Sequence, residues 1–176
     1  MDIETIRACF TCDTSAGLLY WKERPVSHFS NEAYARRWNT KWAGKLALTA
    51  TTTRGYKMGR LFYKPVKAHR VIWALNHGAW PTLDIDHIDG NPANNSISNL
   101  RLASHAENMK NVRMHRDNTS GYKGVSFSPQ TREKWAARIM ANGVVYRLGR
   151  FKTPEEAAAA YARASQRLHG QFSNPS

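Results

Sequence analysis

The stretch from residue 83 to 115 constrains this chain most, because it alternates short apolar segments with turn signals and spaced polar residues. Leu83 to Ile88 predicts a strand, and Asp89-Gly90-Asn91-Pro92 is a strong turn signal directly after it. Asn99 to Ala103 alternates between apolar and polar residues and predicts a second strand. Two short strands joined by a long polar loop are therefore expected.

A helix is predicted directly after the second strand. Ser104 and Glu107 form a capping box, which predicts a helix from about Ser104 to Met114. The sequence of strand, loop, strand and helix brings four polar residues into one place. These residues are Asp86, His87, Asn99 and Asn108.

This set of side chains suits the hydrolysis of a phosphodiester, which needs a base for water, a cation that neutralises charge and a group that aims the base. Asp86 and Asn108 supply hard oxygen ligands, which favour one Mg²⁺ or Mn²⁺ ion. His87 is the predicted base, because a histidine with the ordinary pKa of about 6.5 accepts a proton at cellular pH. Asn99 is expected to fix the tautomer of His87 through a hydrogen bond.

An amphipathic helix from Lys67 to Gly78 is predicted before the first strand, since its apolar residues share one face and Pro81 follows the terminal glycine. His69 and Arg70 stand at its start. His69 either packs locally or faces the scissile phosphate from the side opposite the metal. Arg70 is a candidate for contact with the same phosphate.

The charge balance indicates a polyanionic partner. The 176 residues contain 26 Lys and Arg against 13 Asp and Glu, which gives a formal charge of +13. Nucleic acid is the expected partner, and a solvated basic surface without function is the alternative. The longest weakly charged stretch, Val71 to Leu83, is too short to span a bilayer, and the N-terminus does not resemble a secretory signal.

Residues 1–60 are expected to form a mixed lead-in region that contacts DNA through scattered arginines and lysines. A turn at residues 14–17, strands at 18–21, 44–48 and 56–63, and a short helix within 31–38 are predicted. Cys9 and Cys12 form a single Cys-x-x-Cys without a second pair. Ordinary packing is therefore favoured for both over a metal or redox role.

Residues 121–176 predict a separate module of three strands and one helix. The strands are expected at 122–128, 134–140 and 144–148, and Asn142-Gly143 is a strong hairpin signal. Thr153 and Pro154 open a helix whose alanine-rich stripe faces the sheet and which Gly170 ends.

The strand period places the other face of this sheet toward solvent, where it is shaped to enter a major groove. A solvated sheet surface is the alternative for the same face. The candidate DNA-binding residues are Lys123, Ser126, Ser128, Arg138 and Arg147.

The central stretch closely resembles the HNH endonucleases of bacteriophages and mobile introns. The resemblance rests on Ala68-His69-Arg70, Asp86 to Asn91, Asn94-Asn95, Asn99-Leu100 and Asn108. It implies a ββα-metal motif with His87 as the general base, Asn99 as the residue that orients it, and Asp86 and Asn108 as ligands of one divalent metal. Asparagine instead of histidine at position 108 makes a zinc-bound version less suitable.

The C-terminal module resembles the AP2 DNA-binding domain over about 50 residues. The matching segments are Tyr122 to Val125, Lys134 to Ile139, Leu148 to Phe151, Thr153 to Ala158 and Ala160-Tyr161. Plant members carry arginines and tryptophans where this chain has Ser126, Ser128, Met140 and Val145, so their target sequence does not transfer.

The sequence therefore predicts an α+β chain with four parts, namely a lead-in region (1–60), an HNH core (61–115), a linker (116–120) and an AP2-like domain (121–176). The expected function is site-selective, metal-dependent cleavage of double-stranded DNA by an endonuclease of the homing type. It is expected to act in the cytoplasm of a bacterial host, encoded by a phage or mobile element, as a monomer or weak dimer. The alternatives are a DNA-binding regulator that does not cut and, more remotely, an RNA-binding or structural phage protein.

Overall fold

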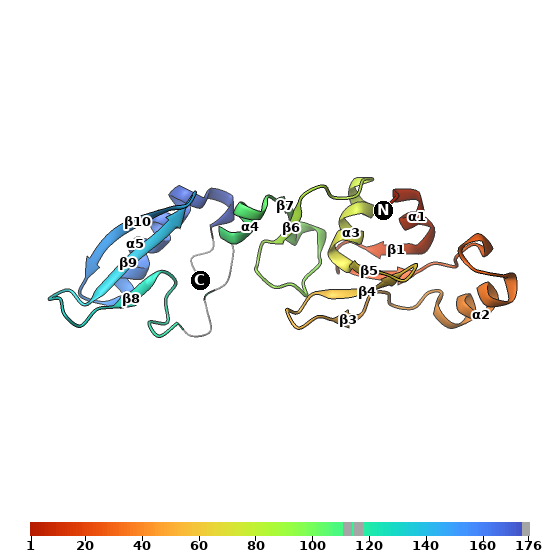
Figure 1. The fold of residues 1–176 in the computed structure, drawn as a ribbon, viewed down its shortest axis with the longest axis horizontal. Coiled ribbons are helices and arrows are strands. Elements are labelled where there is room, and N and C mark those ends of the chain that lie inside the picture. The colour runs from red at the N-terminus through yellow and green to blue at the C-terminus, as the bar shows by residue number, and fades with distance from the viewer. Residues whose placement is uncertain (111–113, 115–117, 174–176) are drawn as a thin grey trace. The chain divides into compact units, whose positions relative to one another are not determined.

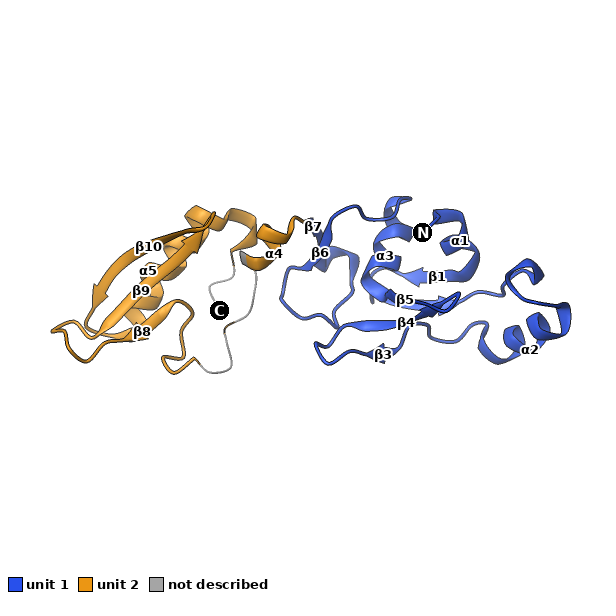
Figure 2. Cartoon of the chain, viewed as in Figure 1, with its two compact units in different colours: residues 1–102 blue, residues 103–176 orange. Residues whose placement is uncertain are grey.

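The structure, a computed structural model, describes residues 1–110, 114 and 118–173. It divides into two compact units, residues 1–102 and residues 103–176, which are considered separately (Figure 2). The last part of the helix predicted to Met114 and residues 116 and 117 of the predicted linker lie outside the described residues.

The first unit mixes short helices with small antiparallel sheets (Figure 1). Its elements are α1 (Ile3–Cys9), β1 (Phe10–Asp13), β2 (Leu18–Trp21), η1 (Val26–His28), α2 (Glu32–Trp42), β3 (Ala50–Thr51), β4 (Lys57–Leu61), β5 (Lys64–Lys67), α3 (Ala68–His77), β6 (Asp84–His87), η2 (Ile97–Asn99) and β7 (Leu100–Ala103).

The hairpin of β1 and β2 confirms the predicted turn. The strands pair antiparallel from Phe10 opposite Trp21 to Asp13 opposite Leu18. The Asp13 carboxylate accepts hydrogen bonds from the backbone N–H groups of Ser15 and Ala16, both at 3.0 Å. These bonds fix the turn locally, as aspartate does at the start of many turns.

The α3 helix is also confirmed, and Gly78 ends it in the left-handed conformation with φ of 73°. The strand predicted at 56–63 is instead the hairpin of β4 and β5, which reverses at Phe62 and Tyr63 with positive φ. The strand predicted at 44–48 is wrong: that segment forms one isolated bridge, from Leu46 to Tyr20. Its backbone at Leu48 turns left-handed, with φ of 52°, which breaks an extended run.

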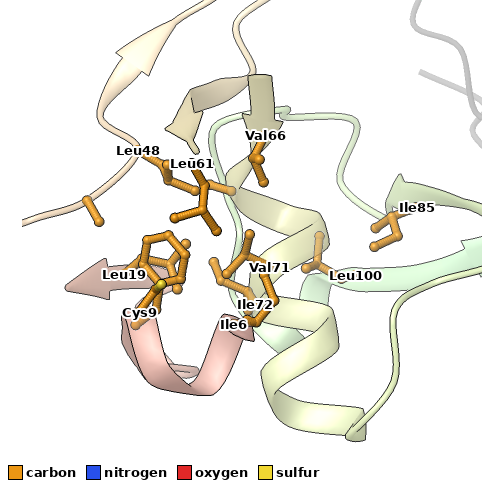
Figure 3. Packing of buried hydrophobic residues seen from close by; sticks show 13 residues of the cluster. Ile6, Cys9, Leu19, Leu48, Leu61, Val66, Val71, Ile72, Ile85 and Leu100 are labelled. Atoms are coloured by element: carbon orange, nitrogen blue, oxygen red, sulfur yellow. The ribbon is translucent and has the colours of Figure 1, made fainter. Parts of the chain in front are cut away.

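One hydrophobic core runs through the first unit. Side chains from α1 and the first hairpin, such as Ile6 and Leu19, pack with Val71 and Ile72 of α3 (Figure 3). Leu100 of β7 belongs to the same cluster. The lead-in region and the strands of the predicted HNH core therefore share one core, and no boundary falls at residue 60.

The second unit contains the predicted three strands and helix. Its elements are α4 (His105–Lys110), β8 (Val125–Phe127), β9 (Trp135–Ala141), β10 (Val144–Phe151), α5 (Pro154–His169) and η3 (Gly170–Phe172). The strands are antiparallel in the order β10-β9-β8, and α5 packs against them (Figure 1). None of the described helices of the chain is long and apolar enough to cross a membrane.

Burial confirms most of the predicted faces of this sheet. Ala137 and Ile139 are buried, whereas Arg138 is exposed. The strand period places Phe127 on the inner face with Val125, but its side chain is 51% exposed and lies against the ring of Trp135. The short strand β8 ends at Phe127.

Candidate active site

His87 is the last residue of β6, and its ring is buried. Its exposed fraction is 5%, and its Nε2 atom lies 3.0 Å from Oδ1 of Asn95, which is 2% exposed. Burial lowers the pKa of His87, and the contact with Asn95 and the charges of Asp89 and Asp86 oppose that shift. A neutral imidazole in this place can accept a proton.

Asn99 does not make the predicted contact with His87; its carboxamide closes the loop between β6 and β7. Its Oδ1 accepts from the backbone N–H of Asp89 at 3.0 Å. Its Nδ2 donates to the Asp89 carboxylate at 3.0 Å and to the carbonyl of Asn94 at 2.8 Å. The expected tautomer-fixing contact therefore belongs to Asn95, and Asn99 holds the loop that carries Asn95.

The Asp89 carboxylate accepts several of the hydrogen bonds that hold this loop. Besides Asn99, the N–H of Asn91 and the amide of Asn94 donate to its carboxylate, each at 2.7 Å. Burial alone would raise the pKa of Asp89, but these hydrogen bonds lower it below the ordinary value.

Asp86 is paired with Arg101 of the neighbouring strand β7. The Arg101 Nη2 and Nε atoms lie 2.6 and 2.8 Å from Oδ2 of Asp86, and the Asp86 side chain is 5% exposed. The guanidinium therefore fixes the direction of a carboxylate directly beside the predicted base.

His69 lies against His87 and is almost fully buried. The two rings are edge to face, with centroids 5.1 Å apart, and Tyr56 contacts both. Burial, and then the charges of His87, Lys67 and Arg70, lower the pKa of His69 to about 3. His69 is therefore neutral at cellular pH, and its edge-to-face contacts with Tyr56 and His87 favour the local packing role over contact with a phosphate.

Arg70 bonds inward. Its guanidinium donates to the backbone carbonyls of Pro81 and Leu83 at 2.6 and 3.1 Å and lies over the Trp80 ring. It ties α3 to the segment that leads into β6. Lys67 is the better candidate for a phosphate, because it is exposed and its ammonium lies 4.8 Å from the centre of the Tyr56 ring, which also touches both histidines.

Asn108 belongs to α4 of the second unit, and the capping box that starts this helix is confirmed. The Glu107 carboxylate accepts from the Ser104 N–H at 2.8 Å, and the Ser104 hydroxyl accepts from the Glu107 N–H at 3.3 Å. Asp86 and Asn108 as a pair of ligands remain a prediction, because they belong to different units.

The donors near His87 fit a hard divalent cation, since carboxylate and amide oxygens are its usual ligands. Among the described residues, no group of three or more His, Cys, Asp or Glu side chains is arranged to hold a metal ion. Cys9 and Cys12 are free, and the Cys9 sulfur lies 3.7 Å from Nδ1 of His28.

The outer face of the second unit's sheet carries three exposed arginines. Arg138 pairs with Arg147 across β9 and β10, and a bulge between Arg147 and Gly149 places Arg150 opposite Ala136 on the same face. Ser126 is opposite Ala136 on the other side, and Ser128 follows at the end of β8, half-buried. Lys123 lies before β8 and is half-buried, and burial lowers its pKa.

Comparison with known proteins identifies the family. A family model described as HNH endonuclease matches residues 66–110. Protein 3.8 of Escherichia phage T7 is 40% identical over 117 residues, which make up 66% of this chain and 95% of that protein. The chain belongs to the HNH endonuclease family.

Two further proteins are similar to this chain over a smaller share of their own length. An uncharacterized HNH endonuclease, L560, of Acanthamoeba polyphaga mimivirus is 33% identical over 122 residues, which are 68% of this chain and 59% of that protein. A solved structure, described as DNA binding and cleavage by the HNH homing endonuclease I-HmuI, is 22% identical to this chain in sequence. The TM-score of the two structures is 0.39. That match covers 63% of this chain and 55% of the other.

Sequence reasoning missed four residues at this HNH site. Asn95 had a signal, because it belongs to the Asn94-Asn95 pair of the family pattern, but its partner depends on the path of the loop. Nothing in the pattern assigned partners to the others. They are Tyr56, Lys67 and Arg101.

Proposed function

We propose that this chain is a site-selective, metal-dependent DNA endonuclease of the homing type, in which His87 is the general base. The observation that carries the proposal is the buried His87 ring, held by Asn95 beside the fixed Asp86 carboxylate. A neutral histidine can act as a base for the attacking water, and a carboxylate beside it can be a ligand of a divalent cation, and both assist hydrolysis of a phosphodiester.

The roles of the side chains follow from their surroundings. His87 takes a proton from the attacking water, and Asp86 would be a ligand of one Mg²⁺ or Mn²⁺ ion. When bound, that ion neutralises charge on the phosphate and on the departing oxygen. Lys67, exposed beside the ring of Tyr56, binds a neighbouring phosphate.

The second unit selects the site as an AP2-like domain. The order of its strands, the helix α5 and the exposed arginines of its outer face support this role. Arginine side chains read guanine in a major groove, and a small antiparallel sheet fits that groove. The charge of +13 favours association with DNA from a distance.

The test uses the full chain and supercoiled plasmids that carry the DNA flanking its own gene. With Mg²⁺ or Mn²⁺ we expect nicked circles with ends at one position, and with EDTA none. His87→Ala abolishes nicking, whereas His77→Ala, which changes an exposed histidine at the end of α3, does not. A parent protein that binds these plasmids and leaves them intact with either metal is a regulator, and the nuclease proposal then fails.

A further inference from the structure

We infer that the tip of the hairpin formed by β4 and β5 contacts DNA bases: the ring of Tyr63 inserts at a flexible base-pair step of double-stranded DNA and unstacks it. The inference rests on the proposed function for its partner, which is DNA. Base stacking is measured without cutting, so the two proposals can fail separately.

The turn at this tip contains residues that fit it poorly. Leu61 pairs with Lys64, so Phe62 and Tyr63 alone connect the two strands. Both are left-handed, with φ of 48° and 64°. Turns of this kind favour Asn-Gly or Asp-Gly, because a β-carbon is unfavourable at positive φ. Two aromatic residues at this place therefore cost stability, and such strain is typical of functional positions.

Phe62 is held by the part of the chain that precedes α2. The Arg24 guanidinium, whose residue is 8% exposed, lies over the rings of Phe29, Trp38 and Phe62 at 4.7, 4.8 and 4.7 Å from their centres. The ring of His28 packs edge to face on Phe62 at 5.0 Å. These contacts hold the turn in its strained conformation.

Tyr63 is left pointing into solvent from a fixed base. Its exposed fraction is 92%, the highest of the large hydrophobic side chains among the described residues. Leu61, two residues earlier, is 1% exposed and belongs to the hydrophobic core of the first unit. A rigid turn thus presents one unburied ring, so little entropy is lost when that ring binds.

The charges around the tip select DNA as the partner. Residues 50–67 contain five Lys and Arg and no Asp or Glu. Arg60 and Lys64, on either side of the turn, are both exposed. Cations bind phosphates, and an aromatic ring stacks on bases of any sequence, so the combination fits a nucleic acid better than an apolar protein surface.

The hairpin also leads to the active site. β5 continues directly into α3, and Lys67 at its end lies beside the Tyr56 ring, which contacts His69 and His87 (Figure 1). Four strand residues separate Tyr63 from Lys67, a span of about 13 Å. That span equals about four base-pair steps at about 3.4 Å each, so Tyr63 reaches bases close to the phosphate at Lys67.

Permanganate footprinting measures the effect, because permanganate oxidises thymines that are unstacked. The probe is the plasmid DNA that flanks the gene, bound by the full chain in EDTA so that it is not cut. TA and CA/TG steps unstack most easily and always contain a thymine. We expect the parent protein to make thymines reactive at one position.

Three variants test the role of the ring. Tyr63→Phe should keep the reactive thymines. Tyr63→Gly should lose them and raise the Kd about 10-fold, yet unfold at a higher urea concentration than the parent, because glycine relieves the strain of the turn. Tyr34→Ala, which changes a tyrosine that is 55% exposed on α2, is the control and should keep them.

The outcomes separate the two proposals. If the parent nicks its site but no thymine becomes reactive, or if reactivity persists in Tyr63→Gly, the inference fails and the nuclease assignment stands. The inference also fails if Tyr63→Gly is less stable than the parent, because the ring then supports the fold. If the parent leaves DNA intact with either metal but unstacks thymines through Tyr63, the proposed cutting fails and the inference stands. A parent that does not bind the DNA overturns both.

Discussion

Two nitrogens of Arg101 converge on one oxygen of Asp86: Nη2 and Nε lie 2.6 and 2.8 Å from Oδ2. The side chains are 15% and 5% exposed, so this ion pair is poorly screened. We predict that Arg101→Leu lowers the free energy of unfolding by about 3 kcal/mol, because it leaves a buried carboxylate without its guanidinium partner. Urea unfolding at neutral pH measures the loss.

The exposed pair of Arg36 and Glu32 provides the control. Both of its side chains are more than 70% exposed, so Arg36→Leu should leave the unfolding free energy unchanged within error. The double variant Asp86→Asn, Arg101→Leu should be more stable than Arg101→Leu alone. Equal losses for the buried and the exposed pair would contradict this account of Arg101.

His69 should make the fold sensitive to acid. Its pKa is about 3 in the folded chain against 6.5 for the free side chain, so above pH 6.5 it is neutral in both states. As the pH falls from 6.5 toward 3, only the unfolded chain binds the proton, and stability is lost. At pH 5 the loss is about 2 kcal/mol relative to pH 7.5.

The measurement is urea unfolding at pH 7.5 and pH 5 for the parent and His69→Gln. The variant should lose about 2 kcal/mol less than the parent between these two pH values, because glutamine does not titrate. His77→Gln, which changes an exposed histidine, should follow the parent. The same loss in His69→Gln and in the parent would place the acid sensitivity in another group.

Replacement of Asn99 should loosen the loop between β6 and β7 and lower the stability of the fold. Asn99→Ala removes three hydrogen bonds that close the loop, so we predict a loss of about 2 to 3 kcal/mol and faster exchange of the Asp89 amide proton. Hydrogen exchange followed by NMR tests both. Unchanged protection at Asp89 would show that the loop is held by other contacts.

The sequence predicted best where the signal was local. Thr153 caps α5 by accepting from the Glu156 N–H at 3.2 Å, and Gly78 ends α3 in the left-handed conformation, both as the residue types require. Position 99 shows the limit of such signals. Spacing placed Asn99 near His87, but the direction of its carboxamide depends on its hydrogen bonds with Asp89, ten residues earlier in the chain.

The outer face of the second unit shows the same limit. Strict alternation along the third strand turns Arg147 outward and Arg150 inward. The bulge before Gly149, whose φ is 130°, shifts the register by one residue and turns Arg150 to the outer face. The predicted third strand ended at residue 148, and a bulge leaves no mark in the hydrophobic period, so Arg150 was not a predicted DNA-binding residue.

That register leads to a prediction about DNA affinity. Arg138→Ser, Arg147→Ser and Arg150→Ser should each weaken binding, and the slope of log K against log salt should fall by about 1 for each arginine that contacts a phosphate. Fluorescence anisotropy over a salt series measures the slope. Arg163→Ser, which changes an exposed residue of α5, is the control. If Arg150→Ser behaves like Arg163→Ser, the bulge does not bring Arg150 to DNA.

Gly17 and Gly44 form a matched pair that tests how the first hairpin supports the base. Both have positive φ, 68° and 75°, so alanine costs about 1 to 2 kcal/mol in backbone strain at either position. Only at Gly17 does the new Cβ meet another backbone, that of Asn95 at 2.3 Å, whereas nothing lies within 4 Å at Gly44. Gly17→Ala should therefore be the less stable variant in urea and should also disturb the ring signals of His87. Equal stability of the two variants, with an undisturbed His87, would show that the hairpin turn does not hold the catalytic loop.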